Sequence, residues 1–324
     1  VQLPRNPSIS LTLENCRSET LLQYDVKETP SNDISLDFYF DGALNETFGA
    51  KTKAFFESLD DIFPFLKQLH FTIHSGNSFP HSSGIASSAS GMSALALNLC
   101  SLEDKLFGTL EDPLAFDQKA SFLARLGSGS ASRSIYPHLA VWGQTGEIEG
   151  SSDLYATPYG DQTHEIFKGL HDAIMLVSKA EKSVSSRAGH RLMEGNPYAD
   201  SRYQQAKQRI HDLIYILKAG DMEAFGAIAE SEALTLHALM MSSNPSYILM
   251  RPNTLRMIEL IRDYRAQTKQ AVYFSLDAGP NIHLLYPDDI KEQVQLFIDE
   301  QLEPLCENRQ WIKDWVGEGP VQLE

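Results

Sequence analysis

Two stretches of this sequence consist mostly of small residues and have the composition of anion-binding loops. The first runs from Pro80 to Met92, is rich in Gly, Ala and Ser, and leads into an apolar helical pattern that reaches Leu99. Small residues let a backbone approach a ligand closely, and a helix N-terminus offers unpaired N–H groups and a partial positive charge. The stretch therefore predicts a phosphate-binding loop, with a surface turn before a core helix as the alternative. It contains neither the Walker A pattern nor the dinucleotide pattern of glycines.

The second stretch covers residues 127–134 and combines two glycines with hydroxyl groups and a guanidinium. Ser128, Ser130 and Ser132 supply hydrogen-bond donors, and the planar fork of Arg133 suits a carboxylate or a phosphate. The alternative is a surface arginine that makes no specific contact. The second glycine of the lipase-type Gly-x-Ser-x-Gly pattern is missing, so the stretch predicts an anion-binding loop and no nucleophile elbow.

A carboxylate ends one of the apolar stretches. Asp277 follows residues 271–276, whose composition is typical of a buried strand, and it precedes the segment Ala278-Gly-Pro-Asn281. A carboxylate in a rigid turn at the end of a buried strand is placed to contact a substrate hydroxyl group. The alternative is an aspartate that only caps the turn.

The histidines give weaker signals. His70 and His74 share one face of an expected strand, but no acidic residue stands at metal-ligand spacing, so we expect solvent-facing side chains. His237 lies among leucines on an expected apolar helix, and we expect it to be packed near the cleft. The sequence identifies no metal ligand.

Composition limits the class of protein. The 324 residues carry a formal net charge of -16, which argues against broad nucleic-acid binding because that function needs a basic surface. Cys16, Cys100 and Cys306 are odd in number and far apart, which indicates a reducing cytosol and neither a disulfide framework nor a zinc site. No apolar run approaches a membrane span, and residues 1–30 lack a signal peptide, so we expect a soluble cytoplasmic protein.

The expected secondary structure mixes strands and helices. Apolar alternation or apolar runs predict strands at residues 8–13, 34–40, 69–74, 154–158, 171–177, 271–276 and 282–286. Helical spacing predicts helices at residues 50–58, 92–99, 113–125, 206–217, 222–241, 254–265 and 289–303. Hairpin signals such as Asp41-Gly42, without regular βαβ spacing, favour an α+β fold. We place a domain boundary before the strand at 171–177, which divides the chain into residues 1–168 and 169–324.

The loop motifs carry a resemblance to a known family. Residues 77–91, Asn-Ser-Phe-Pro-His-Ser-Ser-Gly-Ile-Ala-Ser-Ser-Ala-Ser-Gly, resemble the ATP-phosphate motif of the GHMP kinase superfamily and, within it, that of the diphosphomevalonate decarboxylases. Further segments are similar to motifs of that family in the family's order, namely residues 4–10, 127–134, 184–186 and 274–281. The resemblance therefore covers essentially the whole chain.

The resemblance implies a fold and an activity. The fold is α+β of the GHMP kinase type, with an N-terminal ribosomal-protein-S5-like half and a C-terminal ferredoxin-like half around a deep cleft. The activity is ATP-dependent decarboxylation of mevalonate 5-diphosphate to isopentenyl diphosphate in isoprenoid biosynthesis, with ATP and Mg²⁺ required and a homodimer expected. The alternatives are a mevalonate or mevalonate-phosphate 3-kinase, a monophosphate decarboxylase, or an inactive phosphate-binding homologue.

The resemblance also implies roles for individual residues. Asp277 would orient or deprotonate the C3 hydroxyl of the substrate, Arg133 would bind its carboxylate, and Ser130 would support the reacting oxygen. The ATP phosphates would be bound by Gly84, Ala86, Ser87, Ser88 and Ala89. Substrate would also be bound by Ser128, Ser185 and Ser186.

Two departures from the family pattern bear on these roles. Arg187 stands where the family usually has threonine after its serine pair. A Tyr-Trp-Gly-Lys-type segment belongs to the family's first strand and helps bind substrate. We expect that strand to lie upstream of Val1.

Overall fold

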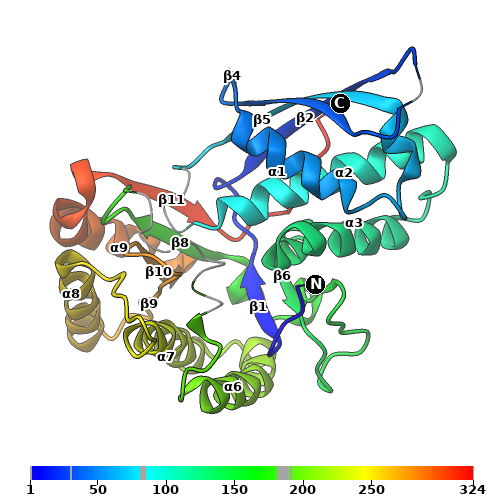
Figure 1. Ribbon diagram of the computed structural model, residues 1–324. Coiled ribbons are helices and arrows are strands. Elements are labelled where there is room, and N and C mark those ends of the chain that lie inside the picture. The colour runs from blue at the N-terminus through cyan, green and yellow to red at the C-terminus, as the bar shows by residue number, and fades with distance from the viewer. Residues whose placement is uncertain (1, 30, 81–84, 181–188, 190–191, 324) are drawn as a thin grey trace.

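Strands and helices are interspersed along the chain in a computed structural model that describes residues 2–29, 31–80, 85–180, 189 and 192–323 (Figure 1). The strands are β1 (Ser8–Leu11), β2 (Ser18–Val26), β3 (Ser35–Phe40), β4 (Ala43–Leu44), β5 (Leu69–Asn77), β6 (Leu139–Trp142), β7 (Ala156–Pro158), β8 (Leu170–Met175), β9 (Tyr273–Ser275), β10 (Ile282–Pro287) and β11 (Trp311–Trp315). The helices are α1 (Glu46–Glu57), α2 (Ser87–Phe107), α3 (Pro113–Gly127), α4 (Glu165–Lys168), α6 (Ala199–Ala219), α7 (Met222–Met241), α8 (Pro252–Thr268) and α9 (Lys291–Phe297).

The N-terminal half is built on a sheet with the strand order β2-β5-β3-β4. β2 pairs antiparallel with β5, with Ser18 opposite Asn77, and β3 pairs parallel with β5. The turn at Asp41 and Gly42 returns the chain into β4. Both turn residues have positive φ, 49° and 80°, as a type I′ turn requires, and the predicted hairpin is confirmed.

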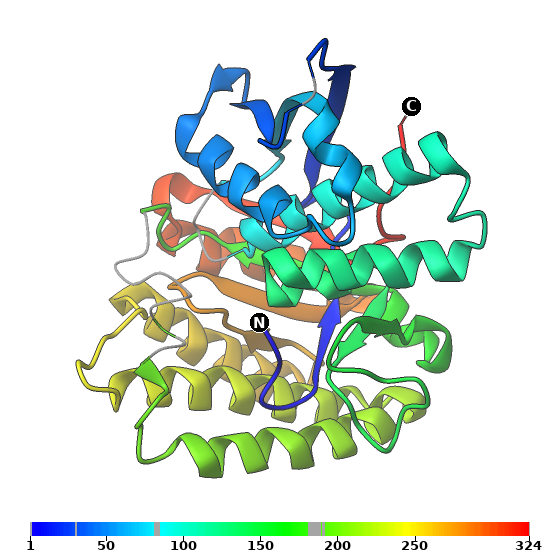
Figure 2. The ribbon, with the colours of Figure 1, turned by 45° about the vertical axis from the view of Figure 1, so that its right-hand side comes forward.

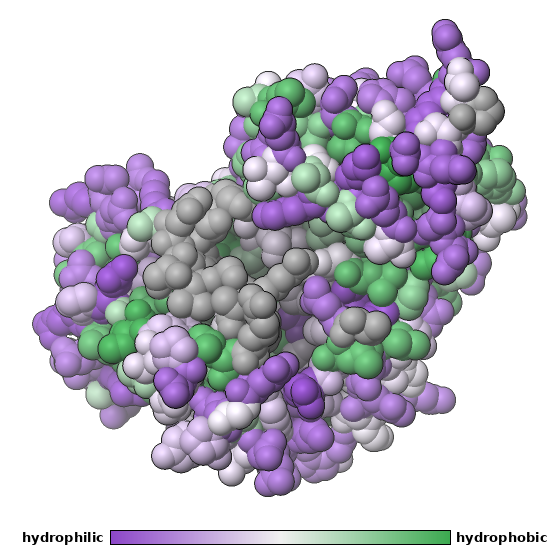
Figure 3. All heavy atoms as spheres, in the orientation of Figure 1, coloured by the Kyte–Doolittle hydropathy of each residue, from purple (hydrophilic) through white to green (hydrophobic). Residues whose placement is uncertain are grey.

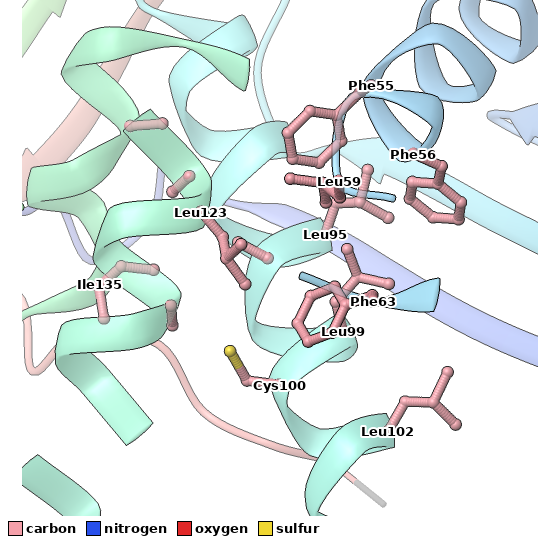
Figure 4. Close-up of a cluster of buried hydrophobic side chains, with 14 of the residues drawn as sticks. Phe55, Phe56, Leu59, Phe63, Leu95, Leu99, Cys100, Leu102, Leu123 and Ile135 are labelled. Carbon is pink, nitrogen blue, oxygen red and sulfur yellow. The ribbon is translucent and has the colours of Figure 1, made fainter. Parts of the chain in front are cut away.

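One apolar core holds the helices of this half in place. α1 and α2 pack on the sheet and α3 packs against α2 (Figure 1). Figure 4 shows side chains of α1, α2 and α3 meeting in this core, among them Phe55, Leu95, Leu99 and Leu123. Burial of one such side chain contributes about 1.5–3 kcal/mol, so the core fixes where α2 starts relative to the sheet.

The C-terminal half is built on an antiparallel sheet with the strand order β11-β8-β10-β9. α7 and α8 pack on β9, and α6 packs on α7 (Figure 2). Phe274, Ile282 and Leu284 of the sheet share a core with Ile261 of α8 and Phe297 of α9. Every residue of β8 is buried, including the charged Asp172.

A third sheet, with the order β1-β6-β7, joins the two halves. β1 lies near the middle of the molecule in Figures 1 and 2. Leu139 and Val141 of β6 share a core with Ile214 and Leu217 of α6. β8 begins just after this sheet, at Leu170. The division of the chain into two domains between residues 168 and 169 stays a prediction.

The structure confirms the mixture of helices and strands and corrects several bounds. Strands β2, β6 and β11 were not predicted. α1 begins at Glu46 and not near residue 50, because the Asn45 side chain accepts a hydrogen bond from the Phe48 N–H at 2.9 Å and caps the helix. The prediction of a single helix at residues 289–303 is wrong. α9 ends at Phe297, a π-helical turn follows, and Pro304 next to it cannot donate a backbone hydrogen bond.

Candidate active site

A cleft of about 1750 Å³ lies between the two halves and is lined by residues of β1, β2, α2, α6, α7 and β10. The face shown in Figure 3 is largely hydrophilic. Among the sequence-predicted site residues, the cleft brings together Ala86 and Ala89 with Ser130, Arg133 and Asp277. Both small-residue loops therefore reach one cavity together with the predicted catalytic carboxylate.

The first loop leads directly into α2. Ala86, with a φ of 55°, is the residue before the helix, and among the described residues no side chain caps the helix start. N–H groups of the first turn therefore remain available to an anion. Ser87 and Ser88 lie in this turn but outside the cleft lining, and Gly84 lies outside the described residues.

Two serines of α2 that the sequence analysis did not single out also line the cleft. Ser90 and Ser93 follow Ala86 and Ala89 at helical spacing, so Ala89, Ser90 and Ser93 share the face of α2 that turns to the cleft. The Ser90 hydroxyl accepts the Ser18 N–H at 2.9 Å, which joins α2 to the start of β2. Helical spacing from the phosphate loop was the signal that could have identified them.

The second loop forms a 3-10 segment, Gly129–Ile135, directly after α3. A Cβ atom on Gly129 would lie 2.6 Å from the Trp142 ring, so this position requires glycine. The segment carries Ser130 and Arg133 into the cleft, whereas Ser128 caps the C-terminus of α3 and lies outside the lining.

Arg133 has a buried guanidinium that is only partly satisfied. Its Nη1 donates to the Ser8 hydroxyl, and its Nε is buried without a hydrogen-bond partner among the described residues. Burial lowers the pKa of Arg133 to about 10, and the Asp277 carboxylate opposes that shift. Arg133 therefore stays charged at neutral pH, and its buried Nε–H is available to an anionic ligand.

The turn that carries Asp277 is held by its backbone. The Asp277 carbonyl accepts hydrogen bonds from the Gly279 N–H at 2.7 Å and from His237 Nε2 at 3.0 Å. The Thr254 hydroxyl donates to the Pro280 carbonyl at 2.6 Å. The Asp277 side chain itself is exposed to the cleft. The backbone is thus fixed while the carboxylate remains available for chemistry.

His237 belongs to this support. It is 1% exposed, and burial lowers its pKa, so the ring is neutral at pH 7. Because its partner is a carbonyl oxygen, the proton lies on Nε2. The predicted packing of His237 near the cleft is confirmed.

An ion pair in the C-terminal sheet also faces the cleft, and the sequence analysis did not single it out. His283 Nδ1 of β10 lies 2.8 Å from Asp172 Oδ2 of β8, and both residues line the cleft. Burial opposes charge on His283, but Asp172, Asp277 and Asp314 outweigh it and raise its pKa to about 9. A charged residue inside the apolar stretch 171–177 was the signal that could have found this pair.

A buried carboxylate ties the two ends of the described chain together at the cleft. Asp314 of β11 is 0% exposed and accepts N–H groups of Glu14 at 3.0 Å, Asn15 at 2.8 Å and Cys16 at 2.7 Å. Glu14 and Cys16 line the cleft. This wall therefore depends on a contact between β11 and the segment that precedes β2.

Among the other predicted residues, His74 also lines the cleft. Ser185, Ser186 and Arg187 lie outside the described residues. His74 stacks on the Tyr39 ring at 4.8 Å, and His70 Nδ1 lies 2.7 Å from the Ser35 hydroxyl. The described ranges contain no group of three or more His, Cys, Asp or Glu side chains that could hold a metal ion. Within the same ranges, no helix has both the length and the apolar character needed to span a bilayer.

Two family profiles match most of the chain. One is described as the diphosphomevalonate decarboxylase-like N-terminal domain and matches residues 1–156. The other is described as the mevalonate 5-diphosphate decarboxylase C-terminal domain and matches residues 173–319.

Individual relatives agree with the profiles. The chain is 30% identical to diphosphomevalonate decarboxylase of Ganoderma lucidum over 91% of this chain and 75% of that protein. It is 25% identical to diphosphomevalonate decarboxylase of Bos taurus over 95% of this chain and 79% of that protein.

Solved structures share the fold. Mevalonate diphosphate decarboxylase from Enterococcus faecalis has a TM-score of 0.80 and 27% identity, covering 98% of this chain and 90% of that one. The enzyme from Staphylococcus aureus has a TM-score of 0.81 and 26% identity, covering 98% and 89%. A structure of MDDEF in complex with MVAPP, AMPPCP and magnesium has a TM-score of 0.81, 28% identity and coverages of 98% and 90%. The predicted GHMP-type α+β fold is confirmed.

Proposed function

Because the chain belongs to the diphosphomevalonate decarboxylase family, we propose that it converts mevalonate 5-diphosphate and ATP to isopentenyl diphosphate, ADP, phosphate and CO2. The observation that carries the proposal is the partly satisfied guanidinium of Arg133, electrostatically coupled to the exposed carboxylate of Asp277 in one cleft. A cationic fork for a substrate carboxylate and a base for a substrate hydroxyl are the two groups that this reaction requires.

The start of α2 is the proposed site for the phosphates of ATP. The phosphate oxygens would be bound by backbone N–H groups of the first turn of α2. The residues that would contact them are Gly84, Ala86, Ser87, Ser88 and Ala89. Mg²⁺ bound with ATP would supply neutralisation of phosphate charge. Mg²⁺ in such sites takes one or two carboxylates, water and phosphates, which fits a cleft without a dedicated metal cluster in the described residues.

The opposite wall would hold the phosphoryl acceptor. Arg133 would bind the carboxylate of mevalonate 5-diphosphate, and Ser130 would support its C3 oxygen, with Ser128, Ser185 and Ser186 as further substrate contacts. Asp277 would orient the C3 hydroxyl and take its proton while the γ-phosphoryl group moves from ATP to the C3 oxygen.

The second step breaks two bonds. The C3–O bond breaks and releases phosphate, and the bond to the carboxyl carbon breaks and releases CO2, with its electron pair forming the alkene. Positive character develops at C3 as phosphate leaves, and the Asp277 carboxylate would stabilise it. We also expect a homodimer in the cytoplasm, which light scattering and localisation of the protein in its own cells would test.

The test measures CO2 and ADP from purified protein with ATP, Mg²⁺ and mevalonate 5-diphosphate. We expect CO2 and ADP in equal amounts. ADP without CO2 would indicate a 3-kinase, and neither product would indicate an inactive phosphate-binding homologue. A parallel reaction with mevalonate 5-phosphate separates a diphosphate from a monophosphate decarboxylase.

A further inference from the structure

The Asp172–His283 pair gives the cleft a second oriented cation besides Arg133. His283 Nδ1 bonds to the Asp172 carboxylate at 2.8 Å across neighbouring strands β8 and β10. A carboxylate on one ring nitrogen fixes the orientation of an imidazole and leaves the other nitrogen for a ligand. Nε2 of His283 has no hydrogen-bond partner among the described residues, although the ring is largely buried. The pair thus holds one N–H donor toward the cleft.

This donor lies beside the proposed reacting centre. His283 is opposite Ser275 in the β9–β10 pairing, and Ser275 precedes Asp277 by two residues. All three residues line the cleft. The charge of Asp277 acts on both His283 and Arg133, and all three residues line the same cleft.

The surrounding charges keep His283 protonated. Three carboxylates act on it, namely those of Asp172 of β8, Asp314 of β11 and Asp277 after β9. Further titratable or charged groups line the same cleft, namely Cys16, Arg133 and the ion pair of Arg209 with Glu232. Burial and Asp314 raise the pKa of Cys16 well above its usual range, so its thiol stays neutral. With a pKa of about 9, His283 is an imidazolium at pH 7.

We propose that His283 donates its Nε2–H to the phosphoryl group that is transferred and then released beside Asp277, and that Asp172 is the residue that positions the ring. This inference rests on the proposed function. A phosphoryl group in transfer and the phosphate that leaves both carry negative oxygens, and a fixed cationic donor stabilises them without reorganisation. No proton needs to move, because His283 donates a hydrogen bond and remains protonated.

A purely structural pair would tie β8 to β10, but those strands are already joined by backbone pairing from Ile282 to Pro287. The two roles differ in their dependence on pH. A structural pair leaves the pH profile of turnover unchanged, whereas a donor to phosphate makes the rate depend on the protonated ring.

The experiment compares kcat and kcat/KM of wild-type protein, His283→Gln and Asp172→Asn from pH 6 to pH 10, using CO2 release. For His283→Gln we expect a loss of kcat of about 10²-fold, and the alkaline limb of kcat/KM near pH 9 disappears. In Asp172→Asn that limb moves to lower pH, because the ring loses the carboxylate that favours its charge. His211→Gln is the matched control, because His211 pairs with Glu147 at 2.7 Å outside the cleft.

A second measurement stands apart from turnover. Nitrogen NMR of the labelled wild-type histidines is recorded with and without inorganic phosphate. The signals of the His283 ring are identified as those that are missing from the spectrum of His283→Gln. Phosphate that raises the His283 pKa and shifts its Nε2 signal supports the proposal even if the wild-type protein releases no CO2. A Nε2 signal unmoved by phosphate, or a His283→Gln enzyme with the wild-type rate and alkaline limb, overturns it.

Discussion

The backbone of Asp277 is fixed by hydrogen bonds, whereas no described residue forms a hydrogen bond with its side chain. A substitution of the side chain therefore tests its chemistry without disturbing the turn. Asp277→Asn keeps the shape of the side chain and removes its charge. We expect a folded protein that still binds ATP and whose kcat for CO2 release falls by about 10²–10⁴-fold, because the base for the C3 hydroxyl is lost. Single-turnover CO2 release, with circular dichroism to verify folding, measures this.

Asp289→Asn is the control for that substitution. Asp289 is also an exposed aspartate, but it lies outside the cleft lining. It should retain wild-type turnover. An Asp277→Asn protein that releases CO2 as fast as Asp289→Asn would remove Asp277 from the mechanism.

Residues in contiguous motifs could be predicted from the sequence, whereas paired residues could not. Asp277 and Arg133 lie in short segments whose turn chemistry is visible in the letters around them. Asp172 and His283 are 111 positions apart and meet only through the β8–β10 register, which a single sequence does not specify. Ser90 could not be predicted as a cleft residue, because the sequence does not specify which face of α2 turns to the cleft.

At the scale of elements, helix α7 lies close enough to β9 to exclude even one methyl group. A Cβ atom on Gly226 would come within 2.0 Å of the Tyr273 ring, whereas one on Gly91 of α2 would meet no atom within 4 Å. Both glycines are inside helices, where alanine is favoured by about 1 kcal/mol. We expect Gly91→Ala to raise the free energy of unfolding by up to that amount. Gly226→Ala should lower it by about 1–2 kcal/mol, because overpacking exceeds the gain in helix propensity.

Urea unfolding of the two variants without ligand measures this difference. The pair controls itself, because the same substitution has opposite expected signs at the two positions. Equal stabilisation of both variants would show that β9 can move away from α7. In that case the Asp277 turn, which follows β9, would be less rigid than its hydrogen bonds indicate.

Most helices could be predicted because their apolar spacing is regular, but strands β2, β6 and β11 could not. In β2 the inner face begins with the polar Ser18 and Thr20, and the otherwise polar outer face carries the exposed Leu21, so apolar and polar residues do not alternate strictly along the strand. β11 contains Lys313 and the buried Asp314, and a charged residue within a short stretch argues against a buried strand. Asp314 is buried because it accepts backbone N–H groups, which is a tertiary reason.

At the scale of the whole molecule, stability should fall as the pH rises from neutral. His283 has a pKa of about 9 in the folded protein, against an ordinary value of 6.5. Between these values the folded state keeps a proton that the unfolded state has released, so its contribution to stability is full below pH 6.5 and is lost by about pH 9. Burial also raises the pKa of Cys100 and Cys306 to about 12, which acts with the same sign above pH 8.5.

Urea midpoints at several pH values from 6.5 to 9.5 measure this effect. The wild-type midpoint should fall across the series, and the midpoint of His283→Gln should fall less steeply, since one of the titrating groups is gone. Parallel curves for the two proteins would contradict the assignment of that slope to His283.

The contact between Asp314 and the segment Glu14 to Cys16 has a consequence for how the protein is made. The hydrogen bond from the Cys16 N–H spans 298 positions in the chain. At 5–20 residues per second, a ribosome needs about 15–60 s to produce the second partner after the first. The helices of the N-terminal half can pack during that interval, but one wall of the cleft forms only once β11, the last described strand, has been made. The nascent chain therefore holds an unfinished binding site until β11 has been made, and this wall of the cleft forms only after that point.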